Sequence, residues 1–258
     1  LRTGTPCNQN CVFCFNKNRL KYELELDELK ESVEKLSKIQ KNTICFSGGE
    51  PTLRKDIIEL VAYTKGMGFK TIGLQTNGMN LEKKEKLKEL VNSGLNYVYF
   101  SLHSGDPSVS DSLTGVLGGF EKTINAIKNA SDLDIDIEVN FVINKKNYYG
   151  LPDYVKLIES ISRKIRIEFS FMIPLKDKII NKENLPKFST IKPFLLKALD
   201  YCSKKDICFT LSSCSIPYCF CGSYIDKSVE LKHMINIKDK QEDVPKYSNI
   251  KGMSEEKR

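Results

Sequence analysis

The chain has no tryptophan and only two histidines among its 258 residues. It also lacks any run of about 18 apolar residues, the length that a membrane-spanning helix requires. Residues 1–10 have no apolar core of the kind found in a secretory signal. These absences predict a cytoplasmic protein that does not enter a membrane.

The formal net charge of +7 comes from lysines spread along the chain rather than from one basic block. We interpret these lysines as solvated faces of an ordinary globular protein. The alternative is a basic surface for nucleic acid or a phosphorylated substrate. No basic and aromatic motif of an RNA-binding module occurs, so nucleic acid is not the expected partner.

Nine cysteines are present, and their distribution is uneven. Three fall within the first 14 residues, Cys45 stands alone, and five lie between Cys202 and Cys221. Without a secretory signal a disulfide framework is not expected, and clustered cysteines then indicate metal or cluster binding.

Short β-branched segments alternate with longer amphipathic segments through the middle of the chain, and this repetition is typical of parallel strands joined by helices. Five such units and an N-terminal stub predict the α/β class and a partial (β/α)6 TIM-like barrel. The alternative is a doubly wound open sheet. The expected strands are 43–47, 70–76, 96–101, 134–144 and 164–173, and the expected helices are 25–40, 56–67, 81–93, 119–130 and 149–162.

The pattern weakens after Pro174. We expect the barrel to span residues 1–175 and a cysteine-rich C-terminal extension to span 176–237. The extension should contain a helix at 191–204 and a short strand at 207–211. Residues 238–258 are strongly charged and are expected to form a mobile tail.

Cys7, Cys11 and Cys14 form a C-x3-C-x2-C pattern on a polar, turn-rich segment. Three thiolates on one loop can bind three corners of a [4Fe–4S] cluster and leave the fourth iron open to another ligand. Taken alone, the three cysteines could also belong to a zinc site. A closed zinc site needs a fourth ligand, and no further Cys or His precedes Cys45.

Two further features accompany the triplet. Phe13 directly precedes Cys14, and the segment Ser47-Gly48-Gly49-Glu50-Pro51 follows an expected strand. Together with the cysteine spacing, they resemble the radical S-adenosylmethionine (SAM) superfamily. The resemblance implies a [4Fe–4S] cluster that cleaves SAM reductively to a 5′-deoxyadenosyl radical, which then abstracts hydrogen from substrate. It also implies an external electron donor of the flavodoxin or ferredoxin type.

The resemblance further implies a set of residues near SAM, with Gly48, Gly49 and Glu50 at its amino group. His103 stands where many relatives have Asp. It is a candidate for a proton or hydrogen-atom relay or a substrate contact, or is only a hydrogen-bonding residue of its loop. Asn77 is either a SAM contact or a turn residue. The other implied cofactor-binding residues are Phe13, Ser101, Asn140, Val142 and Met172.

Cys214, Cys219 and Cys221 have C-x4-C-x-C spacing and are candidate ligands of an auxiliary metal site, such as a second iron–sulfur cluster. Alternatively, one cysteine here could donate a hydrogen atom to a substrate radical. Cys202 and Cys208, just upstream, could simply be buried as small apolar residues.

The stretch from GGEPTLRKD to VNFVINKKN resembles two branches of the superfamily. One modifies peptides or proteins, and we expect this chain to be of that type. The other is the GTP cyclase of molybdenum-cofactor synthesis, whose usual C-x2-C second site is absent here. A non-catalytic iron–sulfur or zinc-binding module is the alternative from another class, and GGEP at a strand end argues against it.

Overall fold

The computed structural model describes residues 1–14, 16, 21–172, 182–212 and 217–229, with the side chains of Lys182 and Tyr218 left undescribed. Six parallel strands form one sheet in the order β1-β2-β3-β4-β5-β6. The strands are β1 (Thr43–Phe46), β2 (Thr71–Thr76), β3 (Tyr97–Ser101), β4 (Asp136–Ile143), β5 (Arg166–Phe171) and β6 (Phe209–Leu211).

Seven α-helices and several 3-10 turns connect the strands in the described part of the chain. The helices are α1 (Leu26–Ile39), α2 (Ile57–Gly66), α3 (Lys84–Ser93), α4 (Pro107–Thr114), α5 (Gly119–Ser131), α6 (Leu151–Ile161) and α7 (Phe188–Lys204). The turns are η1 (Pro51–Leu53), η2 (Met79–Leu81), η3 (Tyr148–Gly150), η4 (Lys182–Asn184), η5 (Tyr218–Phe220) and η6 (Gly222–Lys227).

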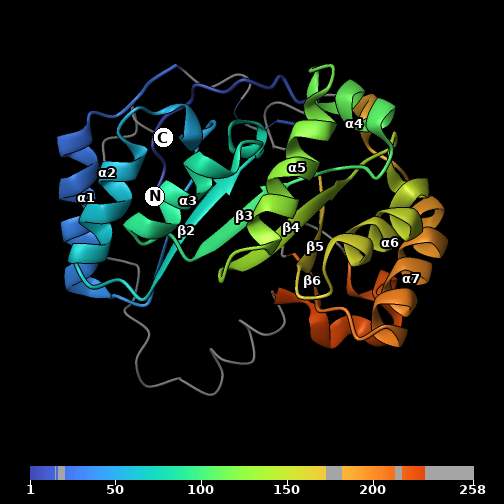
Figure 1. Cartoon of the computed structure of the whole chain (residues 1–258). Helices are drawn as coiled ribbons and strands as arrows, with labels where there is room; N and C mark the ends of the chain where they lie inside the picture. The colour runs from blue at the N-terminus through green and yellow to red at the C-terminus, as the bar shows by residue number, and fades with distance from the viewer. Residues whose placement is uncertain (15, 17–20, 173–181, 213–216, 230–258) are drawn as a thin grey trace, which may run out of the picture.

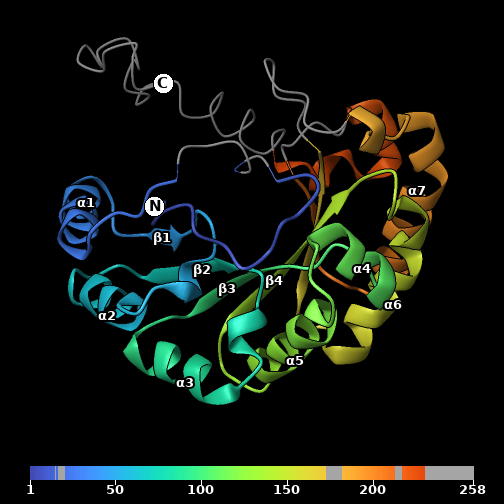
Figure 2. The same cartoon turned by 90° about the horizontal axis from the view of Figure 1, so that it is seen from above.

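The sheet is curved and open, and its helices cover the outer face. Figures 1 and 2 show α2, α3, α5 and α6 outside the sheet, while the N-terminal segment crosses the inner side. A doubly wound sheet would reverse its strand order and carry helices on both faces. The sequential order therefore confirms the predicted partial barrel and excludes the doubly wound alternative.

The first residues of the chain extend the sheet beyond β1. Arg2 forms a parallel bridge with Ser47. The Thr3 N–H donates to the Ser47 carbonyl at 2.8 Å, and the Ser47 N–H donates to the Leu1 carbonyl at 2.9 Å. This pairing brings the cysteine segment onto the end of the sheet where β1 stops.

Alternate strand residues build the core between sheet and helices, as the two-residue period of a strand requires. Phe46, Leu74, Phe100, Val139 and Phe169 are all fully buried. Their neighbours along each strand point to the opposite, inner face, which leaves that face free to carry polar groups.

Helix α4 was not among the expected elements, although its sequence carries the usual end signals. The Asp106 carboxylate accepts from the Val109 N–H at 3.1 Å, Pro107 occupies the first turn, and Gly115 ends the helix with a φ of 70°. An N-cap Asp followed by Pro is a known helix start. The short apolar stripe of α4 concealed it from a search for periodicity.

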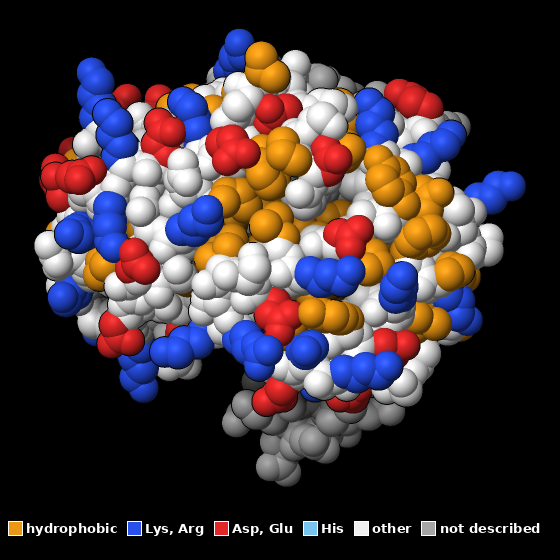
Figure 3. All heavy atoms as spheres, turned by 45° about the vertical axis from the view of Figure 1, so that its right-hand side comes forward, with side chains coloured by type: hydrophobic (Ala, Val, Ile, Leu, Met, Phe, Trp, Pro, Cys, Tyr) orange, Lys and Arg blue, Asp and Glu red, His pale blue; other side chains and the backbone are white. Residues whose placement is uncertain are grey.

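Charges of both signs mix across the surface in Figure 3, with hydrophobic side chains exposed between them. This view fits the interpretation of scattered, solvated lysines. Among the described residues, no helix combines the length and apolar character needed to cross a membrane.

Candidate active site

The cysteine loop lies over the carboxyl ends of the strands, and α4 holds it there. The Asn10 N–H donates to the Thr114 carbonyl at 2.8 Å, and the Val12 N–H donates to the Leu113 carbonyl at 2.9 Å. These acceptors are free C-terminal carbonyls of α4, which need partners outside the helix. The helix that sequence reasoning missed is thus a support of the predicted cluster loop.

The three loop cysteines are all reachable from solvent. Cys7 is exposed, and Cys11 and Cys14 are partly exposed. The Cys14 N–H donates to the Cys11 carbonyl at 3.1 Å, which makes a turn between these two residues. Within the part of the chain that is described, no three Cys, His, Asp or Glu side chains converge on one point. The loop thus carries three thiols within eight positions, and they do not meet at one point.

Gly48 and Gly49 allow the strand end to touch the segment that precedes the cysteines. A Cβ on Gly49 would lie 2.0 Å from the Pro6 carbonyl oxygen, and one on Gly48 would lie 2.3 Å from the Gly4 carbonyl oxygen. Gly48 also has a φ of 133°, which favours glycine. The two glycines are therefore required by close contact between chain segments, whatever further ligand they meet.

The side chain of Glu50 is buried, and both of its carboxylate oxygens accept hydrogen bonds. Its Oε1 accepts from the Thr52 N–H at 3.0 Å, the Thr52 hydroxyl at 2.5 Å and the Thr76 hydroxyl at 2.7 Å. Its Oε2 accepts from the Asn77 N–H at 2.7 Å. Each carboxylate oxygen has two acceptor sites, so three donors crowd Oε1 while Oε2 keeps one site open. Burial nevertheless raises the pKa of Glu50, and the hydrogen bonds from Thr52, Asn77 and Thr76 oppose the rise.

Asn77 links the end of β2 to the cysteine loop. Its Nδ2 donates to Asn8 Oδ1 at 2.7 Å and approaches Cys7 Sγ at 3.9 Å. Its Oδ1 accepts from the Met79 N–H at 3.0 Å. Asn77 is thus both a turn residue and a contact of the loop.

His103 lies buried beneath Phe13. The two rings meet edge to face, with their centroids 4.7 Å apart. His103 Nδ1 accepts from the Val142 N–H at 3.1 Å, so the neutral ring carries its proton on Nε2. Burial lowers the pKa of His103 to about 4, against a small opposing effect of the Asn140 backbone. The imidazole is therefore neutral near pH 7.

His103 should make stability depend on pH in a defined direction. Its pKa falls from 6.5 in the unfolded chain to about 4 in the fold. Between these values the unfolded state binds the extra proton, so acid favours unfolding. The free energy of unfolding should fall by up to about 3 kcal/mol from pH 7 to pH 4 through this residue.

Urea unfolding of the wild type and of His103→Gln across this pH range measures that contribution. Other groups titrate equally in both proteins, so the difference between their pH profiles isolates His103. Parallel profiles would contradict a buried neutral histidine.

The remaining residues implied near SAM lie along the carboxyl ends of β3, β4 and β5. Ser101 pairs with Asn140 across the sheet, and Asn140 Oδ1 accepts from the Ser170 hydroxyl at 2.6 Å. Val142 is half-buried and Met172 is buried. They lie at the same sheet edge as the cysteine loop, as expected for parallel strands.

Sequence reasoning missed a polar inner wall formed by Tyr97, Tyr99, Glu138, Arg166 and Glu168. The Tyr97 hydroxyl donates to Glu138 Oε2 at 2.9 Å, and Arg166 Nε lies 3.6 Å from that oxygen. Burial raises the pKa of Glu168, the nearby Glu138 charge adds to the rise, and hydrogen bonds from Ser212 and Tyr99 oppose it. The signal was available, because these polar residues alternate with buried apolar ones in each strand.

The C-terminal cysteines are only partly placed. Cys214 lies outside the described residues. Cys219 is exposed, whereas Cys221 is buried with its thiol 3.7 Å from the Pro217 carbonyl. Cys202 is fully buried on α7, and burial raises its pKa to about 12. Cys202 is thus a packing residue, while Cys208 is exposed.

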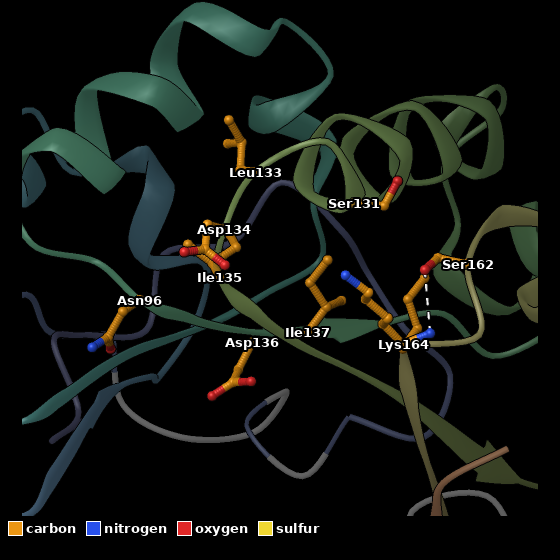
Figure 4. A pocket seen from close by; sticks show the side chains of 10 residues that line it. Asn96, Ser131, Leu133, Asp134, Ile135, Asp136, Ile137, Ser162 and Lys164 are labelled. Carbon is orange, nitrogen blue, oxygen red and sulfur yellow. Dashed lines mark hydrogen bonds between the residues drawn. The ribbon is translucent and has the colours of Figure 1, made fainter. Parts of the chain in front are cut away.

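A hollow opens at the end of the sheet opposite the cysteine loop. It measures about 350 Å³ and lies at the amino ends of β3, β4 and β5 (Figure 4). Asp134, Asp136 and Lys164 are among its lining residues. In barrel folds this end contributes to stability, whereas activity resides at the carboxyl ends.

The radical SAM superfamily model matches residues 1–166 of the chain. The chain belongs to the radical SAM superfamily. Members of this superfamily are enzymes that use a [4Fe–4S] cluster and SAM. The family match covers the cysteine loop, the GGEP segment and β1 to β4, the parts that meet at the carboxyl edge of the sheet.

Curated relatives with different substrates match the chain at similar levels. Fe-coproporphyrin III synthase of Methanosarcina barkeri is 34% identical over 156 residues, 59% of this chain and 38% of the relative. PqqA peptide cyclase of Rhodopseudomonas palustris is 34% identical over 154 residues, which cover 58% of this chain and 40% of the relative. The probable GTP 3′,8-cyclase of Methanocaldococcus jannaschii is 35% identical over 180 residues, which cover 67% of this chain and 58% of the relative.

Solved structures share the fold. Streptococcus suis SuiB bound to its precursor peptide SuiA superposes with a TM-score of 0.71 and 20% identity, covering 87% of this chain and 50% of SuiB. The anSMEcpe structure with AdoMet and a peptide gives a TM-score of 0.69 and 19% identity, covering 80% of this chain and 61% of that protein. The chain therefore spans about half of these proteins, and 38–40% of the first two curated relatives.

Proposed function

We propose that the chain cleaves SAM at a cluster held by Cys7, Cys11 and Cys14 and uses the resulting radical to modify a peptide or protein. The observation that carries the proposal is the position of the cysteine loop. It crosses the carboxyl edge of an open half-barrel, directly against GGEP. Cys7, Cys11 and Cys14 would hold the cluster, which would supply the electron for reductive cleavage of SAM and so the radical chemistry on substrate.

The residues present suit such a cluster. Three thiols within eight positions, all reachable from solvent, offer three ligands and leave one iron open. GGEP lies beside them and offers main-chain carbonyls together with one open acceptor site on Glu50 Oε2, which takes a single donor from Asn77. We therefore assign the SAM amino group to acceptors of the 48–50 segment.

The surrounding residues position these parts and exclude water. Phe13 covers the buried His103, and His103 in turn holds the Val142 N–H at the end of β4. The SAM nucleoside can then rest on one edge of polar and apolar residues, which consists of Ser101, Asn140, Val142 and Met172. The electron comes from an external donor of the flavodoxin or ferredoxin type.

The inner wall favours a peptide or protein substrate. It lies on the face of the open sheet opposite the helices and combines phenols, carboxylates and a guanidinium. Such mixed groups suit the amides and side chains of an extended peptide. The comparisons support this, because the SuiB and anSMEcpe structures each hold a bound peptide.

A small-molecule substrate is the second candidate. It rests on the GTP 3′,8-cyclase of Methanocaldococcus jannaschii, which matches 67% of this chain at 35% identity. We rank it lower because the inner wall carries two carboxyl groups, Glu138 and Glu168, against the single guanidinium of Arg166, so its charge does not attract a triphosphate.

The test is anaerobic turnover of the full chain with SAM and dithionite. Short precursor peptides encoded beside its gene are compared with GTP. We expect one peptide to increase 5′-deoxyadenosine release and to change in mass, whereas GTP should be returned unchanged. Conversion of GTP, with every peptide left intact, would overturn the proposal.

Glu168→Gln provides a matched test of the inner wall. It removes a charge but keeps the side-chain shape and some hydrogen bonding. We expect kcat/KM for the peptide to fall about tenfold, the equivalent of one charge-assisted hydrogen bond. SAM cleavage without peptide should remain unchanged, because the hydrogen bonds of Glu168 involve Ser212 and Tyr99 and not the cysteine loop. Equal loss of both activities would assign Glu168 to the fold instead.

A further inference from the structure

Asn77 holds its side-chain amide in one orientation, and that orientation aims its donors at the cysteine loop. Asn77 Oδ1 accepts from the Met79 N–H at 3.0 Å, so the oxygen must face the turn and the nitrogen must face the loop. The Asn77 backbone is fixed too. Its N–H donates to Glu50 Oε2 at 2.7 Å, and its carbonyl accepts from the Thr123 hydroxyl at 2.8 Å.

The two hydrogens of Asn77 Nδ2 have two distinct acceptors. Asn8 Oδ1 lies 2.7 Å from Nδ2, and Cys7 Sγ lies 3.9 Å away. Cys7 Sγ also accepts from the Gln9 N–H at 3.5 Å. Asn77 is 6% exposed, so water does not readily replace it as a donor. Cys7 therefore receives a side-chain amide as well as a main-chain N–H.

We propose that Asn77 is a positioning residue for the cluster: its amide donates to the Cys7 thiolate and raises the reduction potential of the cluster bound there. This inference rests on the proposed ligation by Cys7, Cys11 and Cys14. Hydrogen bonds to ligand sulfurs stabilise the more negative, reduced form of a cluster. The hydrogen bond from the Asn77 N–H to Glu50 helps to keep the donor in place.

The test compares the midpoint potential of the reconstituted full chain in wild type, Asn77→Ser and Asn8→Ala. Redox titration is followed by the electron paramagnetic resonance signal of the reduced cluster, without SAM. Serine retains a side-chain oxygen for the Met79 N–H but is too short to reach Cys7. Asn8→Ala removes the other acceptor of Asn77 and leaves the thiolate contact intact.

We expect Asn77→Ser to lower the ratio of reduced to oxidised cluster about tenfold at a fixed potential, which is about 59 mV for one electron. Asn8→Ala should leave the ratio close to that of the wild type. An unmoved potential in Asn77→Ser, or equal shifts in both variants, would overturn the inference. If Asn77→Ser loses its iron, Asn77→Gln decides, because it restores an amide. If the Asn77→Gln protein retains its iron, the donor role is supported. If Asn77→Ser and Asn77→Gln both lose their iron, the donor role is contradicted.

Failure of the proposed function would look different. A wild-type chain that takes up no iron contradicts the cysteine ligation itself. A chain that holds the cluster, with potentials that do not respond to Asn77, contradicts only the role of Asn77.

Discussion

Replacing Cys7, Cys11 or Cys14 by Ala is expected to abolish SAM cleavage. Each residue would hold one iron of the cluster, and the loop offers no substitute thiol. After anaerobic reconstitution, each variant should bind little iron and release 5′-deoxyadenosine at least about a hundredfold more slowly than the wild type, because the cofactor supplies the difficult chemistry. Iron and sulfide analysis, with chromatography of the nucleoside product, measures both quantities.

Cys208→Ala is the matched control for these variants. Cys208 is an exposed cysteine next to β6, so its loss costs little stability. Iron content and SAM cleavage should match the wild type. If a loop variant kept full activity, or if Cys208→Ala lost it equally, the assignment of the cluster to the loop would be wrong.

Gly49→Ala is expected to produce the second-largest effect. The added methyl group would lie 2.0 Å from the Pro6 carbonyl oxygen and 2.5 Å from that of Thr5, both of them backbone atoms. The loop would have to move away and lose the bonds from Gly49 N–H to Gly4 and from Glu50 N–H to Pro6. We expect a loss of about 3 kcal/mol in the free energy of unfolding, from overpacking and broken hydrogen bonds.

Gly66→Ala offers a control on the same kind of substitution. No atom lies within 4 Å of a Cβ at Gly66, which ends helix α2. Alanine there should stabilise the protein by about 0.5–1 kcal/mol, since it restricts the unfolded chain. Urea unfolding compares the two variants, and iron uptake should fall only in Gly49→Ala. Similar stability in both would show that the GGEP segment does not press on the cysteine loop.

The fold was predictable because its signals are local and repeated. Each βα unit carries its own apolar period, and sequential parallel pairing follows from right-handed crossovers. The doubly wound alternative stayed open because strand order depends on long-range packing. Helix α4 was missed because its apolar stripe is too short to show a helical period. Its end signals, Asp106 and Gly115, are clear.

Residue spacing predicted the cysteine loop and the GGEP segment of the candidate site, but not their contacts. The positions of Cys7, Cys11, Cys14 and GGEP carried the family, and the family match confirms it. Spacing could not show that Gly49 meets Pro6 rather than only a ligand, or that Glu50 Oε1 takes three donors and Oε2 one. The contacts to Pro6, Thr76 and Asn77 join segments about 26 to 43 residues apart, so they exist only once the sheet has formed.

The C-terminal cysteines are the part of the candidate site that residue spacing predicts least. Their spacing suggested an auxiliary metal site at Cys214, Cys219 and Cys221. In the described structure Cys221 is buried against Pro217 while Cys219 is exposed, and Cys214 lies outside the described residues. An auxiliary site therefore stays a prediction, which a second cluster in the iron count of the wild type would support.

Anaerobic reconstitution of the full chain tests the central claim most directly. The protein is loaded with iron and sulfide, mixed with SAM and dithionite, and analysed for metals and for 5′-deoxyadenosine. A cluster that Cys7, Cys11 and Cys14 hold should give at least four irons per chain, a reduced-cluster resonance signal, and release of 5′-deoxyadenosine and methionine. Bound zinc without iron, together with intact SAM, would contradict it.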